Sequence, residues 1–183
     1  EGPARVAGSE LALRESPPLA EILRVIDKVS QNLHAELLLR EAGRQGKPYG
    51  SREFGIEALR AFLAANAGLS EEDVNFEDGS GLSRLTLLTP EATTNLLVYM
   101  ASTEARDVFL QSLPIGNLDG TLKRRFSRWS AATRVHAKTG SLSHVSSLAG
   151  YLDHPAQGLL AFSLMVNNAN APVSEIRAGI DRL

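Results

Sequence analysis

The sequence predicts an α/β protein of the α+β type, in which helices fill the first two thirds of the chain and an antiparallel sheet follows them. Two patterns predict this order. Apolar residues recur at helical spacing between Leu19 and Met100, and from Arg134 onward they alternate in short runs rich in β-branched residues. The 183 residues are 43% hydrophobic and 22% charged, which is the composition and length of one folded domain.

The first two helices are predicted on either side of a short polar joint. A serine and two prolines at 16–18 form a helix start, because a capping hydroxyl precedes prolines whose missing N–H groups cost nothing in a first turn. Apolar residues then recur at helical spacing at 19–26 and again at 33–38. Between them stand Ser30 and Asn32, residue types that prefer caps and turns. The joint is therefore expected at Ser30 and Asn32.

Three further helices are expected before the sheet, at 51–68, at 89–100 and from 103 onward. The first of these begins at the capping hydroxyl of Ser51, and the second at Thr89, which is followed by Pro90. The stretch 78–81 has two glycines and two turn formers in four residues, so it is expected to be a loop. Another irregular connection is expected at 113–120.

The sheet is predicted from three alternating runs, at 134–138, 145–152 and 159–166. A tight turn at Thr139 and Gly140 and a second turn at 155–158 separate these runs, which predicts an antiparallel meander. A last helix is expected from Pro172 and should lie on the sheet. Its inner face consists of Ile176, Ile180 and Leu183.

Charge and cysteine content exclude several classes of function. The 19 basic and 21 acidic side chains give a formal net charge of -2, so nucleic acid is not an expected partner, because phosphate binding requires a basic surplus. The basic run at 123–128 is expected to be a solvated helix face. The chain has no cysteine and its four histidines lack a metal-binding spacing, so no metal site is expected. No transmembrane segment is expected either, because the longest apolar run, at 159–166, is far shorter than about 20 residues.

Two short motifs carry the candidate chemistry. Residues 30–32 read Ser-Gln-Asn, an S-x-N triplet at the helix joint, and residues 138–140 read Lys-Thr-Gly, a K-T-G triplet at a strand end. This order and setting are the layout of serine acyl-transfer enzymes that act on D-Ala-D-Ala peptides and β-lactams. Taken singly, Asn32 also fits a helix cap, Ser30 a turn hydroxyl and Lys138 a solvated strand-end lysine.

Four longer blocks surround and extend these triplets. They are Val29 to Glu36, Asp78 to Arg84 followed by Thr89-Pro90, Gly120 to Leu122, and Ala137 to Leu142 continuing to Gly150-Tyr151. Together they resemble the D-alanyl-D-alanine carboxypeptidase/endopeptidase family of low-molecular-mass penicillin-binding proteins, over most of the chain from about Leu19 into the last helix. The resemblance implies a penicillin-binding or serine β-lactamase-like transpeptidase fold, with an antiparallel sheet packed by helices.

The same resemblance implies a function and a location. The expected activity is that of a serine-type D-Ala-D-Ala carboxypeptidase or endopeptidase, which cleaves peptidoglycan stem peptides through an acyl-enzyme and also binds β-lactams. No cofactor is implied by that mechanism. The location implied is extracytoplasmic, in the periplasm or facing the cell wall, because the substrate lies outside the membrane.

The resemblance assigns catalytic roles to three residues. Ser30 stands between the attacking serine and the leaving amine, where its hydroxyl passes a proton. Asn32 holds a substrate carbonyl and the catalytic lysine with its amide. Lys138 places a positive charge where the terminal carboxylate of the substrate arrives.

Substrate-binding roles fall on the three residues that follow Lys138. Thr139 adds a hydroxyl to the carboxylate site, and Gly140 lets the substrate backbone come close. The backbone N–H of Ser141 is expected to be one of two oxyanion-hole donors at the strand edge. Arg84, after the glycine-rich loop, could bind a substrate carboxylate, but an internal ion pair that anchors the loop is the favoured interpretation.

The chain does not contain the S-x-x-K pair that such enzymes need for an activated nucleophile. The residues three positions before its four lysines are Val25, Arg44, Gly120 and Val135. We therefore expect residues 1–183 to be the C-terminal part of a D-Ala-D-Ala peptidase domain that is inactive alone. It should be either associated with the remaining N-terminal part of the same protein or with a second copy, or else marginally stable. The alternatives are a degenerate, non-catalytic module that binds peptidoglycan peptides or penicillin and, less favoured, a serine β-lactamase.

Overall fold

The computed structural model of the protein describes residue 9, residues 11–70 and residues 72–182. Leu183, expected on the inner face of the last helix, lies outside the described residues. The α-helices in this part are α1 (Leu19–Val29), α2 (Asn32–Ala42), α3 (Arg52–Ala67), α4 (Pro90–Ala101), α5 (Arg106–Ser112) and α6 (Val173–Ile180). The strands are β1 (Val74–Asn75), β2 (Leu87–Leu88), β3 (Val135–Leu142), β4 (Val145–His154) and β5 (Gly158–Val166), with short 3-10 helices η1 (Gly120–Leu122) and η2 (Ala132–Arg134).

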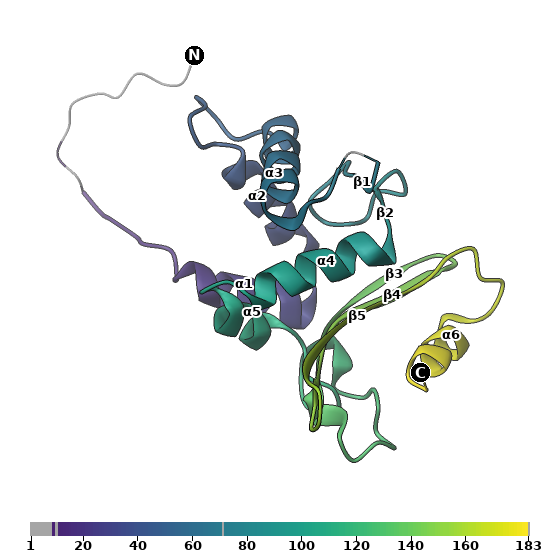
Figure 1. Cartoon of the computed structure of the whole chain (residues 1–183). Coiled ribbons are helices and arrows are strands. Elements are labelled where there is room, and N and C mark those ends of the chain that lie inside the picture. Colours follow the sequence, from purple (N-terminus) through teal and green to yellow (C-terminus); the bar gives the residue numbers. More distant parts are fainter. Residues whose placement is uncertain (1–8, 10, 71, 183) are drawn as a thin grey trace.

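Strands β3, β4 and β5 form an antiparallel meander with β4 in the centre. The register places Lys138 opposite Ala149, and Ala149 opposite Ser163 on the third strand. Helices α1, α4 and α5 lie on one side of this sheet and α6 lies on the other (Figure 1). The predicted α+β order, with helices first and an antiparallel sheet afterwards, is confirmed.

Each face of the sheet has its own apolar cluster. On the α6 side, Val135 and Ala137 of β3 pack in a cluster that includes Ile176. On the opposite side, Tyr151 of β4 packs against Leu97 of α4 and its hydroxyl donates to the Leu97 carbonyl at 2.7 Å. Because successive side chains of a strand point to opposite faces, the side chain after Ala137 in β3 points toward the helical layer.

Helices α2 and α3 touch through their backbones at two glycines. A Cβ on Gly55 would lie 2.3 Å from the carbonyl oxygen of Leu39, and a Cβ on Gly43 would lie 2.2 Å from the Gly55 nitrogen. No side chain larger than hydrogen fits at either position without moving a helix. The position of α2, which begins at the helix joint, therefore depends on this contact.

Helix starts at 51 and 89 agree with the prediction, but others differ. Ser51 accepts from the Phe54 N–H at 3.1 Å and Thr89 accepts from the Ala92 N–H at 3.0 Å, as capping hydroxyls do. Helix α1 instead begins after Pro18 with no side-chain cap, so the prediction of a capping hydroxyl there was wrong. The turn from 103 precedes α5, which begins only at Arg106.

The structure also corrects the turn predicted at Thr139 and Gly140. Strand β3 continues through both residues, and the chain reverses at 143–144, where His144 has a left-handed φ of 64°. A Cβ on Gly140 would lie 2.3 Å from the Ser147 hydroxyl oxygen on β4. This glycine thus marks a close approach between strands, which glycine permits as readily as it permits a turn.

Two further local predictions differ from the structure. The basic run at 123–128 is a series of turns, and its Arg125 donates to Asp181 at 2.9 Å, so it is not one solvated helix face. Strands β1 and β2, two residues each, were not predicted, because a pair of residues is too short to show alternation.

Candidate active site

The joint between α1 and α2 gives Ser30 an uncommon backbone conformation. Ser30 ends α1 with φ 60° and ψ 60°, in the left-handed region, and Gln31 is extended. Helix α2 then begins at Asn32. The backbone thus changes direction within two residues, and both polar residues of the S-x-N triplet lie at the turn.

Lys138 reaches this joint from the middle of β3. Its Nζ donates to Ser30 Oγ at 2.8 Å and to the Thr139 carbonyl oxygen at 3.0 Å. The two residues are 108 positions apart in sequence. The fold therefore brings the S-x-N and K-T-G triplets into direct contact, and Lys138 is a partly buried, paired side chain, not the solvated strand-end lysine of the alternative interpretation.

A carboxylate stands beside this contact. Asp27 lies three residues before Ser30 on α1, one helical turn away, and its Oδ2 lies 2.7 Å from the hydroxyl oxygen of the buried Ser112. Burial raises the pKa of Asp27, although the Ser112 hydroxyl and the charges of Lys138 and Lys28 oppose this. Burial also lowers the pKa of Lys138, and the negative charge of Asp27 opposes that shift. Each group thus supports the charged form of the other.

Replacing Asp27 by Asn is expected to lower the pKa of Lys138 further. The negative charge of Asp27 favours the protonated amine, so its removal leaves the effect of burial unopposed. The pKa can be followed by NMR after ¹³C-dimethylation, since the chain has only four lysines. Lys47 and Lys123 serve as internal controls, because neither is linked to Asp27. An unchanged or raised pKa of Lys138 would contradict the coupling.

The loop before η1 is fixed to α1 by a second lysine. Lys28 Nζ donates to the Leu113 carbonyl at 2.6 Å and to Asp119 Oδ2 at 2.7 Å. Directly after this loop, the Thr121 hydroxyl accepts from the Thr139 hydroxyl at 2.9 Å. Lys28 therefore holds α1 and the loop together, and it positions Thr121 beside the K-T-G triplet.

The outer edge of β3 is partly covered and partly open. The Ala137 N–H donates to the Pro114 carbonyl at 2.9 Å, away from β4. Backbone groups of a strand alternate in direction, so the amides of Thr139 and Ser141 point to the same outer side. Within the described part of the chain, these two amides have no backbone partner on that side. The edge beside Lys138 is therefore free to pair with another extended chain.

Asn32 offers an unused amide to this site. Its side chain is exposed and makes no hydrogen bond among the described residues. The N-cap position of α2 is Gln31, which makes no side-chain cap bond, so the alternative that Asn32 caps the helix was wrong. Asn32 lies two residues after Ser30 and can bind a group placed at the joint.

The glycine-rich loop at 78–81 is anchored to the sheet at the turn between β3 and β4. Arg84 Nη2 donates to the Ser143 carbonyl at 2.9 Å, in the turn that joins β3 to β4. Within the described residues Arg84 makes no ion pair, so the expected internal ion pair is replaced by this hydrogen bond. The loop is nevertheless anchored, as expected.

The described residues show neither a metal-binding cluster nor a membrane-spanning helix. They contain no group of three or more His, Asp or Glu side chains that could hold a metal ion. No helix in them has both the length and the apolar character needed to cross a membrane.

Comparison with known proteins agrees with this geometry. The model of the D-Ala-D-Ala carboxypeptidase 3 (S13) family matches residues 2–183. The chain belongs to this family. The D-alanyl-D-alanine carboxypeptidase of Actinomadura sp. (strain R39) is 35% identical over 167 residues, which are 88% of this chain and 31% of that protein. The S13 chain spans about a third of the length of the curated relatives it matches.

Solved structures show the same relationship. Penicillin binding protein 4 (dacB) from Haemophilus influenzae superimposes with a TM-score of 0.75 and 31% identity, over 85% of this S13 chain and 35% of that one. A class A β-lactamase from Bacteroides cellulosilyticus, 19% identical, shares the fold with a TM-score of 0.66. The expected family and the penicillin-binding, β-lactamase-like fold are confirmed.

Proposed function

We propose that residues 1–183 form the C-terminal part of a serine-type D-Ala-D-Ala peptidase domain and supply the S-x-N and K-T-G half of its active site. The observation that carries the proposal is the 2.8 Å contact between Lys138 Nζ and Ser30 Oγ. The reaction is cleavage of a peptidoglycan stem peptide, as carboxypeptidase or endopeptidase, through an acyl-enzyme that β-lactams also form. Such a substrate places the protein outside the cytoplasmic membrane.

Each side chain has a separate role in this reaction. Ser30 accepts a hydrogen bond from Lys138, so its own proton is free to move toward the leaving amine, and Lys138 can replace it. The open edge of β3 pairs with the substrate backbone as an added strand. There the outward N–H of Ser141 donates to the developing oxyanion, while the amide of Asn32 holds a substrate carbonyl.

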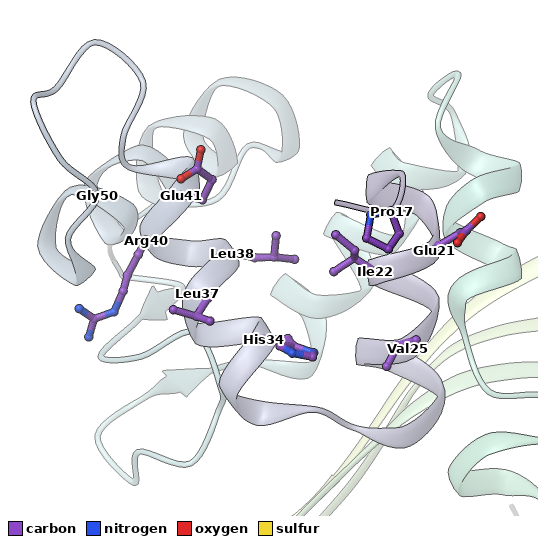
Figure 2. Close-up of a pocket in the computed structure, with 10 residues that line it drawn as sticks. All are labelled: Pro17, Glu21, Ile22, Val25, His34, Leu37, Leu38, Arg40, Glu41 and Gly50. Carbon is purple, nitrogen blue, oxygen red and sulfur yellow. The ribbon is translucent and has the colours of Figure 1, made fainter. Parts of the chain in front are cut away.

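We propose that the nucleophile and its lysine lie outside these residues, because no serine stands three positions before any lysine. An open apolar groove of about 750 Å³ between α1 and α2 is consistent with this. Figure 2 shows Ile22 and Val25 of α1 facing Leu38 and His34 of α2 across the groove.

The surface beside the groove is apolar and exposed. Three large apolar side chains there are at least half exposed: Val29 at 58%, Leu33 at 66% and Leu37 at 51%. In a complete domain, large apolar side chains that lie together like this are usually buried. The curated relatives are about three times as long as this chain. The occupant we propose is therefore the rest of the same protein. Dimerisation through this surface would indicate a second copy instead.

The absence of an S-x-x-K pair also fits a second candidate, a degenerate module that binds peptidoglycan peptides or penicillin without cleaving them. Both candidates use the same groove and strand edge. They differ in whether a serine is acylated.

Labelling with a fluorescent penicillin tests the proposal. The 183-residue chain is expected to take no covalent label, and the natural polypeptide that includes the preceding S-x-x-K is expected to label at the serine of that motif. Prior incubation with unlabelled penicillin should remove the signal. A folded longer polypeptide that stays unlabelled supports the non-catalytic module. Label on a serine of the 183-residue chain itself contradicts the placement of the nucleophile.

A further inference from the structure

The hydroxyls of Thr139 and Ser141 form a row on the α6 side of β3. Alternate residues of a strand share a face, and the α6 face is the one that buries Val135 and Ala137. The contacts agree with this, because Thr139 donates to Thr121 beside that cluster. The row lies along the open edge at which the proposed function places the substrate.

Arg177 of α6 extends this row with a cation. Its Nη2 donates to Ser141 Oγ at 3.0 Å, and both side chains are exposed. A guanidinium has five N–H donors, and within the described residues Ser141 is the only hydrogen-bond acceptor of this one. Most donors of Arg177 are therefore available to a ligand that lies next to Ser141.

Lys138 is less available than Arg177 to bind a ligand that lies next to Ser141. It lies on the opposite face of β3, partly buried, and two of its three N–H donors are used by Ser30 and the Thr139 carbonyl. Arg177 is exposed and keeps its charge at every relevant pH. Of the two cations, Arg177 is the one directed at the side of the open edge that carries the hydroxyls.

We infer that Arg177 is a specificity-determining residue that binds the carboxylate of the C-terminal D-alanine, together with the hydroxyls of Ser141 and Thr139. The inference rests on the proposed function, which places the peptide along β3. A guanidinium pairs with a carboxylate through two parallel hydrogen bonds, whereas it gains no charge pairing with a carboxamide. The site should therefore prefer a peptide acid to the corresponding amide.

NMR titration of the ¹⁵N-labelled chain tests this preference, with N-acetyl-D-Ala-D-Ala and its C-terminal amide as probes and the amides of Thr139 and Ser141 as reporters. The wild-type chain is expected to bind the acid about tenfold more tightly than the amide. A difference of this size is what one charge-assisted hydrogen bond contributes to binding. Arg177→Gln should remove that preference and leave amide binding unchanged. Arg177→Lys should keep part of it. Arg182→Gln is the matched control, since Arg182 is exposed two residues after the end of α6 and, within the described residues, its side chain donates only to the Ala178 carbonyl.

The outcomes separate the inference from the function on which it rests. If Arg177→Gln keeps the tenfold preference, or weakens both probes equally, Arg177 does not read the carboxylate and the peptide site stands. If the wild type binds both probes equally, the inference also fails. If neither probe shifts the β3 amides, peptide binding along this strand is wrong, and the role of Arg177 with it.

Discussion

Replacing Lys138 by methionine is expected to slow acylation by penicillin about 10²- to 10⁴-fold in the longer polypeptide that the proposed function requires, the range attributed to a positioned proton-transfer group. Methionine keeps much of the length and apolar volume of the lysine but removes its charge and the hydrogen bond to Ser30. The rate of fluorescent penicillin labelling measures the effect, and thermal unfolding shows whether the variant is folded.

Lys123→Met is the matched control for this experiment. Lys123 is exposed and makes no side-chain hydrogen bond or ion pair within the described residues, so its loss should leave the labelling rate within about twofold, as for an isolated surface substitution. A Lys138→Met enzyme that labels at the rate of this control would show that the contact between the two triplets has no part in acylation.

Gly55→Ala is expected to reduce the free energy of unfolding by about 3 kcal/mol, at the upper end of the usual cost of overpacking. The added methyl group would lie 2.3 Å from the Leu39 carbonyl oxygen and 2.8 Å from its carbonyl carbon. These are backbone atoms, so the strain is relieved only if α2 and α3 move apart. Urea unfolding followed by circular dichroism measures the change.

Gly179→Ala gives the same chemical change without the contact. Gly179 lies within α6, and a Cβ there would have nothing within 4 Å. Alanine should stabilise this helix by up to about 1 kcal/mol. If Gly55→Ala leaves stability within about 0.5 kcal/mol of the wild type, the order of a neutral surface substitution, the close contact of α2 and α3 is wrong.

Helix starts were predicted correctly where a hydrogen bond between residues close in sequence determines them. The hydroxyls of Ser51 and Thr89 bond to amides three residues ahead, so both helix starts could be read from a few residues. A glycine in the sequence, by contrast, does not by itself indicate which local structure it forms. Gly140 permits either a turn or a close approach of strands, and only the register with Ser147 decides between them.

The site could be predicted only in part for a similar reason. The S-x-N and K-T-G triplets are compact patterns, and the resemblance placed them in one site. Asp27 and Arg177 have no such pattern, because their partners Ser112 and Ser141 lie 85 and 36 residues away. Asp27 was missed. The signal that could have found it is its spacing, one helical turn before Ser30, but nothing in the sequence indicated its burial.

The 108-residue separation of Ser30 and Lys138 also bears on the order of folding. Closing a loop of that length is entropically costly, whereas α2 and α3 are neighbours in sequence and can pack early. The helical pair should therefore form before the two triplets meet. During refolding, the pKa of Lys138 should keep its unfolded value until the sheet docks on α1, so this amine can serve as a probe of the last step in folding.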